Sequence, residues 1–319
     1  MCRVIAVPRE NMKTNECAVT AMGLLVTHAC LLVAMLVTLA TADTMDFIPD
    51  SGGWPMADVF VGKSATLDYR GQHYYFFALD PAIDTYVSGD MLNKGGWEVG
   101  LNMLFDALVQ EEPHHKKLSV LDVGANMGAF SLHAAARGCS VFSFEMQPRI
   151  YGLLELSRRL NGFHNMVLHH AALWNETGSA VSFTPARGNF GGTTLLSGGA
   201  AGTHEMKTKR IDELFTHKDV FFMKIDVENN EDRVLHGMES LLATRSVKHF
   251  VMETRPNQDY MVDWFYGMGY ACGTYDRQLL DIEGAKKLVQ HKDLGDMYCT
   301  VLNKRGGGSI RRLLEQVKT

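Results

Sequence analysis

Residues 120–131 read VLDVGANMGAFS, and this stretch decides the fold of the chain. Mostly apolar residues lead into Gly124, a short turn and Gly128, after which helix-forming residues begin. The pattern predicts a buried strand that leaves through a tight turn into a helix. Gly124 permits a sharp turn without a Cβ clash, and Gly128 lets the helix approach strand and ligand closely. Because open α/β sheets bind ligands outside the carboxyl ends of their strands, this turn is the expected binding site.

The rest of the chain repeats this alternation of apolar strands and helical stretches. Helices between strands with few polar positions predict a mostly parallel, doubly wound α/β sheet, closed by a late antiparallel strand pair. A glycine-rich stretch, 186–202, is predicted as a lid or acceptor loop, or else as a plain surface insertion. The predicted strands are 73–80, 118–124, 140–145, 166–174, 220–227, 248–254, 270–275 and 297–303, the predicted helices are 97–110, 127–138, 148–162, 210–215, 229–244 and 257–269, and 85–96 is predicted as a loop.

An apolar segment, 18–42, carries no Asp, Glu, Lys or Arg. As a helix it would measure about 37 Å, more than the roughly 30 Å hydrocarbon core of a bilayer. Basic residues precede it and Asp43 follows, so the positive-inside rule predicts a membrane anchor with a cytosolic tail and a lumenal or extracellular catalytic part. Ala40-Thr41-Ala42 also fits a signal-peptidase site, and cleavage there would release a secreted protein.

The net charge of the chain argues against one class of binding partner. A formal net charge of −5, without basic runs interleaved with aromatics, argues against nucleic-acid binding. Cys272 and Cys299 lie in the two late strands, and the sequence is compatible with a disulfide between them or with two free thiols. Asn175 begins the one glycosylation sequon.

The chain is predicted to have five parts. They are a cytosolic tail at 1–17, the anchor or signal peptide at 18–42, a linker at 43–71, the catalytic domain at 72–303 and a tail at 304–319.

The turn after the first strand of the sheet favours a cation over a diphosphate. A dinucleotide fingerprint would place a second glycine where Asn126 stands, and that amide would crowd a pyrophosphate. Asp122, at the strand end, would repel a pyrophosphate but suits a sulfonium or an ammonium. Glu145 ends the next strand at the distance expected of the carboxylate that binds ribose hydroxyls. These residues predict S-adenosylmethionine, bound by Asp122, Gly124, Asn126, Gly128 and Glu145.

The strand at 220–227 continues into a row of charged side chains. Lys224, Asp226 and Glu228 alternate with apolar residues, so a period of two puts all three on one face near the carboxyl end. Such charges are costly after an apolar run unless they are paired or contact a ligand. We predict them as catalytic residues, although an ion-pair network without chemistry is the competing interpretation.

These stretches together resemble the FkbM-type S-adenosylmethionine-dependent methyltransferases, over roughly residues 72–303. Two departures stand out: the family usually has glycine where Asn229 follows KIDVE, and proline where Met146 follows FE. The resemblance implies a class I methyltransferase (Rossmann-like) sheet and O-methylation of diverse acceptors. It is carried, in chain order, by residues 118–131, FEMQP at 144–148, KTKRIDEL at 207–214, KIDVENNEDRVLHG at 224–237 and FVMET at 250–254.

The predicted reaction is methyl transfer to a hydroxyl of a small molecule or glycan. Candidates for the base are Asp226, Glu228, His169 and His170, with the Asp226/Glu228 pair preferred and Lys224 holding the acceptor or tuning the carboxylates. The carboxylates leave metal dependence open, but no His or Cys spacing suggests a metal. Two alternatives stay open: a nicotinamide-dependent oxidoreductase, disfavoured by Asp122 and Asn126, and a catalytically silent, membrane-tethered nucleoside-binding module.

Overall fold

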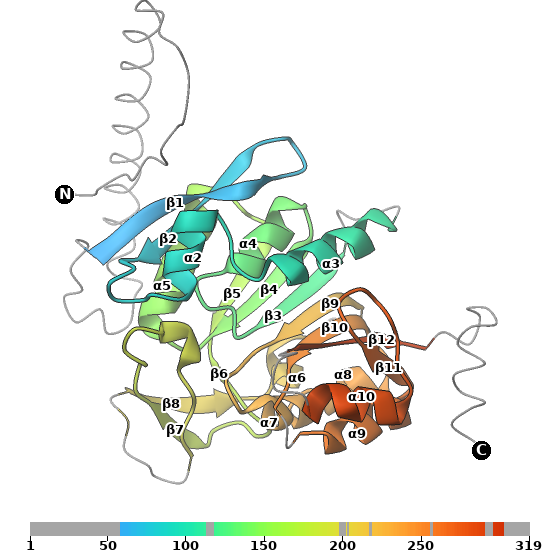
Figure 1. Cartoon of the computed structure of the whole chain (residues 1–319). Helices are drawn as coiled ribbons and strands as arrows, with labels where there is room; N and C mark the ends of the chain where they lie inside the picture. The colour runs from blue at the N-terminus through green and yellow to red at the C-terminus, as the bar shows by residue number, and fades with distance from the viewer. Residues whose placement is uncertain are drawn as a thin grey trace, which may run out of the picture.

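The structure, a computed structural model, is drawn in Figure 1. The apolar segment at 18–42, the tails and most of the predicted linker lie outside the described residues, so their predictions stay untested. Among the helices that are described, none has the length and apolar character needed to span a bilayer. The described residues are 58–112, 118–197, 202, 204–216, 219–255, 258–290 and 296–302.

A seven-stranded sheet forms the centre of the molecule, in the order β11-β12-β10-β9-β3-β4-β5. Neighbouring strands from β10 to β5 run parallel, whereas β12 is antiparallel to both β10 and β11. The predicted doubly wound sheet with a late antiparallel pair is therefore confirmed. The strands are β3 (Ser119–Val123), β4 (Ser140–Glu145), β5 (Met166–His170), β9 (Val220–Ile225), β10 (Val247–Glu253), β11 (Tyr270–Gly273) and β12 (Asp296–Val301).

Two hydrophobic cores lie on the two faces of this sheet. Phe222 and Met223 are both fully buried, yet they point to opposite faces and join different cores. This explains why the sequence of β9 is apolar at consecutive positions. The first core is covered by α3 (Val99–Gln110), α4 (Ala129–Ala136) and α5 (Pro148–Leu160), and the second by α6 (Ile211–Leu214), α7 (Glu231–His236), α8 (Glu239–Ala243), α9 (Tyr260–Met268) and α10 (Ile282–Gln290).

The N-terminal part of the described chain packs as a hairpin and a helix beside the first core (Figure 1). β1 (Val59–Leu67) pairs with β2 (His73–Leu79) in an antiparallel arrangement, so residues 59–67 form a strand where the sequence predicts linker. The predicted loop at 85–96 is also wrong, because it contains α2 (Val87–Lys94). Val87 and Met91 of α2 are buried in the core, and Gly95 ends the helix in the left-handed conformation.

A small three-stranded sheet, absent from the prediction, lies at the edge of the main sheet. It consists of β6 (Ala172–Leu173), β8 (His204–Lys209) and β7 (Ala180–Phe183), and the short 3-10 helix η3 (Phe190–Gly192) follows β7. The predicted strand at 166–174 is thus split into β5 and β6. The predicted helix at 229–244 is split into α7 and α8 around Gly237, where a Cβ would lie 2.1 Å from the carbonyl oxygen of Trp174.

The late strand pair is closed by a disulfide between Cys272 and Cys299. These residues are direct partners across β11 and β12, and both are fully buried. The sequence left bonded and free thiols open, and the structure has the bond. Cys139, between α4 and β4, is buried and lies outside this disulfide.

Candidate active site

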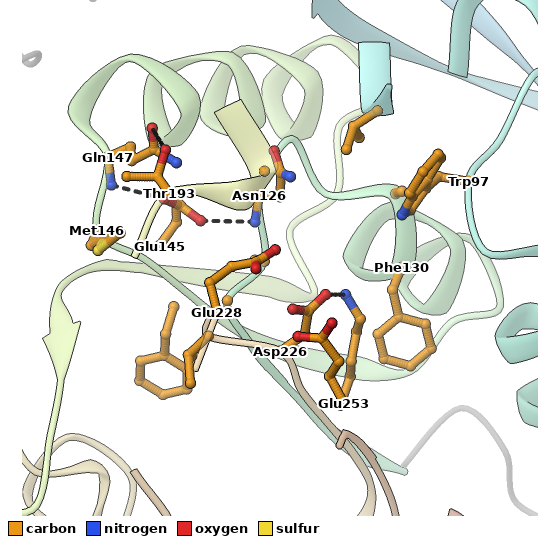
Figure 2. Close-up of a pocket in the computed structure, with 18 of the residues that line it drawn as sticks. Trp97, Asn126, Phe130, Glu145, Met146, Gln147, Thr193, Asp226, Glu228 and Glu253 are labelled. Carbon is orange, nitrogen blue, oxygen red and sulfur yellow. Dashed lines mark hydrogen bonds and ion pairs between the residues drawn. The ribbon is translucent and has the colours of Figure 1, made fainter. Parts of the chain in front are cut away.

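A cavity of about 310 Å³ opens at the carboxyl ends of β3, β4, β9 and β10. This is the edge of the sheet at which the sequence places the ligand. Figure 2 shows Glu145, Met146 and Gln147 on one side, Trp97 and Phe130 on the other, and Asp226, Glu228 and Glu253 below. The cavity therefore combines one wall of loop and helix residues with a floor of carboxylates.

The turn after β3 is shaped by its main chain. Gly124 has a φ of +84°, and a Cβ there would lie 1.7 Å from the carbonyl oxygen of Asp226. Glycine is thus required for β3 and β9 to end side by side, an approach that the Asp226 N–H reinforces by donating to the Val123 carbonyl at 2.9 Å. Asn126 is left-handed as well, with a φ of 50°, and lines the cavity.

Glu145 lies at the end of β4, against this turn. One carboxylate oxygen accepts from the Asn126 N–H at 2.9 Å and the other from the Gln147 N–H at 2.8 Å. Burial raises the pKa of Glu145 to about 7, against the lowering effect of these backbone hydrogen bonds. These backbone donors fix the carboxylate at the cavity wall, where its remaining acceptor capacity suits the hydroxyls of a vicinal diol.

Two of the predicted cofactor-binding residues lie behind the turn and do not line the cavity. Asp122 is fully buried and accepts a hydrogen bond from Ser131 Oγ at 2.5 Å; its pKa is raised by burial. Gly128, with a φ of +85°, makes room for Leu154 of α5, whose Cδ1 would lie 2.2 Å from a Cβ. Both residues therefore shape the turn from its inner side, whereas Gly124, Asn126 and Glu145 line the cavity.

Lys224 lies at the centre of a group of carboxylates. Its Nζ is 2.9 Å from Asp226 Oδ2 and 3.2 Å from Glu98 Oε2. Burial lowers the pKa of Lys224, but the charges of Asp226 and Glu98 outweigh this effect and the net shift is upward. Lys224 is thus a fixed cation at the cavity wall, and the predicted grouping of Lys224 and Asp226 on one face is present.

Arg255 joins two further carboxylates at the floor. Its Nη2 lies 3.3 Å from Glu228 Oε2 and 2.8 Å from a carboxylate oxygen of Glu253. Burial raises the pKa of Glu228 to about 7; burial, followed by the charges of Asp226 and Glu228, raises that of Glu253 to about 8. Both groups therefore titrate near neutral pH, where a proton acceptor is most effective.

The sequence missed part of the wall. Trp97 and Glu98 reach the cavity from the connection between α2 and α3. The one available signal for them was a tryptophan and a glutamate directly after a glycine pair, in GGWEVG. Thr193 also lines the cavity, and it belongs to the glycine-rich stretch 186–202 that the sequence predicts as a lid or acceptor loop, or else as a surface insertion. His169 and His170, named as alternative bases, do not line the cavity: His169 stacks on Phe144 with ring centroids 4.8 Å apart, and His170 Nε2 bonds the Met146 carbonyl.

Two carboxylates of the floor and a third buried beneath it are close enough to share a metal ion. One ligand oxygen from each of Asp226, Glu231 and Glu253 lies within 4.8 Å of the others. Lys224 and Arg255 already neutralise two of them at 2.9 and 2.8 Å. These are the residues that a metal would use, and the absence of a metal stays a prediction.

The sheet order, the glycine turn and the carboxylate at the end of β4 define a class I S-adenosylmethionine-dependent methyltransferase. The cavity fits that cofactor, because it offers carboxylates and no cluster of cations to a ligand with a sulfonium and no phosphate. Residues 122–273 match the model of the methyltransferase FkbM domain. This segment is an FkbM-type methyltransferase domain, as the sequence predicts, and its cofactor is S-adenosylmethionine.

Several solved structures are similar to the chain at low identity. The TehB-like SAM-dependent methyltransferase from Corynebacterium glutamicum is 11% identical, over 67% of this chain and 94% of that chain, with a TM-score of 0.37. The T. Thermophilus 16S rRNA N2 G1207 methyltransferase is 13% identical, over 76% of this chain and 51% of that chain, with a TM-score of 0.40. At such TM-scores these similarities are not evidence for the function of the chain. No curated protein matches the chain.

Proposed function

We propose that the protein transfers the methyl group of S-adenosylmethionine to a hydroxyl of a small molecule or glycan, with Glu228 as the general base. The observation that carries this proposal is the pair of Glu228 and Glu253 at the cavity floor, with pKa values of about 7 and about 8. A hydroxyl must lose its proton as its oxygen is methylated, and a carboxylate of this basicity is suited to accept it.

Glu228 is held in place from several sides. Its backbone is left-handed, with a φ of 53°, and its carbonyl accepts from Thr194 Oγ1 at 2.5 Å. Arg255 keeps the carboxylate directed at the floor. The cofactor supplies a methyl group on an already reactive sulfonium, so a fixed alignment of acceptor and base can provide much of the acceleration. Lys224 holds Asp226 beside this position.

The charge of the cavity narrows the class of acceptor. Glu98, Asp226, Glu228, Glu253 and Asp296 all line it. Carboxylates accept several hydroxyl hydrogen bonds but repel phosphates, which supports a polyhydroxyl acceptor and disfavours a nucleic acid. Trp97 offers an apolar ring face to such a ligand at the opposite wall.

We place the domain in the secretory pathway, either anchored in the membrane through residues 18–42 or secreted after cleavage at Ala42. The Cys272–Cys299 disulfide supports this proposal, because such bonds persist in oxidising compartments. Asn175 of the sequon is exposed, as a glycosylation acceptor must be.

The test uses the full-length protein, S-adenosylmethionine with a labelled methyl group, and cell extract fractionated into glycan, lipid and small-molecule pools. We expect label in the glycan or small-molecule pool, at an alkali-stable methyl ether. Glu228→Gln should lower its formation at least about 100-fold while S-adenosylhomocysteine still binds, because the base is lost and the donor site is kept. Glu205→Gln, an exposed carboxylate on β8 outside the cavity, is the matched control and should leave it unchanged.

Three results would contradict the proposal. Binding of S-adenosylhomocysteine without label in any pool would favour the silent binding module. Label that persists in Glu228→Gln would remove Glu228 as the base, and label in an amine would replace O-methylation by N-methylation.

A further inference from the structure

We propose that Glu98 and Lys224 bind the amino-acid arm of S-adenosylmethionine, Lys224 at its carboxylate and Glu98 at its ammonium. This arm site, defined by those two residues, rests on the cofactor alone and not on the acceptor proposed above. It lies partly outside the matched segment 122–273, because Glu98 comes from the connection between α2 and α3.

The position of the arm site follows from the order of groups along the cavity. Glu145 and Gln147 lie on one side, Asn126 in the middle, and Trp97 on the opposite side (Figure 2). Glu145 is the carboxylate suited to the ribose diol, so the base of the nucleoside lies on its side of the turn. The arm attached to the ribose then extends past Asn126 toward the wall that carries Trp97 and Glu98.

The chemistry of that wall is complementary to a zwitterion. Glu98 and Lys224 form a pair at 3.2 Å, and their side chains are only 22% and 10% exposed. A free amino acid brings one positive and one negative group, so each can take an opposite partner while the net charge of the site stays the same. Burying the arm therefore leaves neither a protein charge nor a ligand charge uncompensated, which is the condition for burying charges at low cost.

The backbone at Glu98 supports a role in ligand binding. Glu98 is left-handed, with φ 51° and ψ 55°, at a position where a glycine would be free of strain. A non-glycine residue in this conformation costs about 1 kcal/mol, and such strain is concentrated at ligand sites. Here it directs the carboxylate toward Lys224 instead of toward solvent.

Lys224 has a partner on each side, so it can exchange one without losing its charge balance. Asp226 lies 2.9 Å from its Nζ, on the side of the floor, and Glu98 on the side of Trp97. The ligand carboxylate can take up the Glu98 side of Lys224 while Asp226 stays in place. Glu98 is then free to accept from the ligand ammonium.

Three ligands separate the two halves of this proposal. S-adenosylhomocysteine has the whole arm, S-adenosyl-3-thiopropylamine keeps the amine but lacks the carboxylate, and 5′-methylthioadenosine lacks both. All three are thioethers, so the sulfonium charge does not enter the comparison. Their dissociation constants are measured by calorimetry on the full-length protein and on Glu98→Gln and Lys224→Met.

We expect Glu98→Gln to weaken the binding of S-adenosylhomocysteine and of S-adenosyl-3-thiopropylamine about 10- to 100-fold, because a charge-assisted hydrogen bond is lost. Lys224→Met should weaken the binding of S-adenosylhomocysteine to a similar degree but leave that of the amine unchanged. Binding of 5′-methylthioadenosine should stay within about twofold in both variants, since it makes neither contact. This neutral ligand also reports whether the variants are folded.

Asp90→Asn is the matched control, because it removes a partly exposed carboxylate paired with Lys94 outside the cavity, and it should change none of the three constants. Equal losses for all three ligands would show a structural role and overturn the proposal. Unchanged binding of S-adenosylhomocysteine in Glu98→Gln would overturn it too. Neither result depends on which acceptor is methylated, so this inference and the proposed function can fail separately.

Discussion

The two halves of the cavity are built in different ways. The nucleoside half, at the ends of β3 and β4, is shaped by main-chain geometry: a left-handed Gly124, a left-handed Asn126 and backbone N–H groups that hold Glu145. The acceptor half, at the ends of β9 and β10, is shaped by charged side chains that neutralise one another: Arg255 between Glu228 and Glu253, and Lys224, which it shares with the arm site, beside Asp226. A change of backbone conformation should therefore disrupt the nucleoside half, whereas the acceptor half should be sensitive to a change of charge.

The largest effect is expected in the nucleoside half, from Gly124→Ala. The added Cβ meets the Asp226 carbonyl at 1.7 Å and the φ of +84° is unfavourable for alanine, so the ends of β3 and β9 must separate. We expect a loss of at least about 3 kcal/mol in the free energy of unfolding, together with the loss of S-adenosylhomocysteine binding. Urea unfolding and calorimetry measure the two effects.

Gly162→Ala is the control for this change, because Gly162 also has a positive φ, of +63°, but no atom within 4 Å of a Cβ. It should cost only about 1 kcal/mol and leave binding intact. If both alanines had equal effects, strain alone and not the contact between β3 and β9 would explain the requirement for Gly124.

A smaller effect is expected in the acceptor half, as a dependence of stability on pH. Glu228 and Glu253 have pKa values of about 7 and about 8 in the folded protein, above the 4.5 of an ordinary glutamate, mainly through burial. The folded state therefore binds more protons than the unfolded state between these values. Their stabilising effect is complete below about pH 4.5 and is lost as the pH rises through 7 to 8.

The free energy of unfolding should accordingly fall by about 2 kcal/mol between pH 5 and 8, less than the full shifts imply, because Arg255 and solvent reduce the penalty. The double variant Glu228→Gln, Glu253→Gln should flatten this dependence in urea titrations, although Glu98 and Glu145, whose pKa values are also about 7, will leave part of it. A stability that rises over this range in the unmodified protein would contradict the charge balance described for the acceptor half.

The smallest effect is expected from Asn229→Gly, which restores the residue that the family usually has after KIDVE. Asn229 is left-handed, with a φ of 73°, a conformation that asparagine tolerates better than most residues. Glycine relieves that strain but gains freedom in the unfolded chain, so the free energy of unfolding should change by less than about 1 kcal/mol. Thermal unfolding tests this, and a loss of several kcal/mol would mean that the Asn229 side chain has a structural role not seen here.

The same contrast explains how much could be predicted from the sequence. The nucleoside half is recognisable because a strand, two glycines and a later acid leave a local pattern, and Gly124, Asn126 and Glu145 indeed line the cavity. Asp122 carries the same kind of signal, yet it faces Ser131 in the interior. A period of two predicts which face of a strand a side chain occupies, but not whether that side chain lines the cavity or is buried in the interior.

The rest could not be predicted, because it depends on contacts between distant parts of the chain. The α2 helix has an unremarkable sequence and is stabilised by burial of Val87 and Met91 in the core. Glu98 reaches Lys224 across more than a hundred positions in the sequence. Raised pKa values at Glu228 and Glu253 likewise follow from burial, which a linear pattern does not report.

Asp84 has a consequence for where this catalytic unit begins. It is fully buried and accepts from the Ser88 N–H at 2.8 Å and from the Phe190 N–H at 3.0 Å, so it ties the segment before α2 to η3 across 106 positions. The matched segment starts at residue 122, downstream of this tie and of Trp97. A protein shortened to begin at residue 122 would leave the Phe190 N–H without its acceptor and would lose Trp97 from the wall of the cavity. The unit that binds the donor therefore extends upstream of the matched segment, at least as far as Asp84.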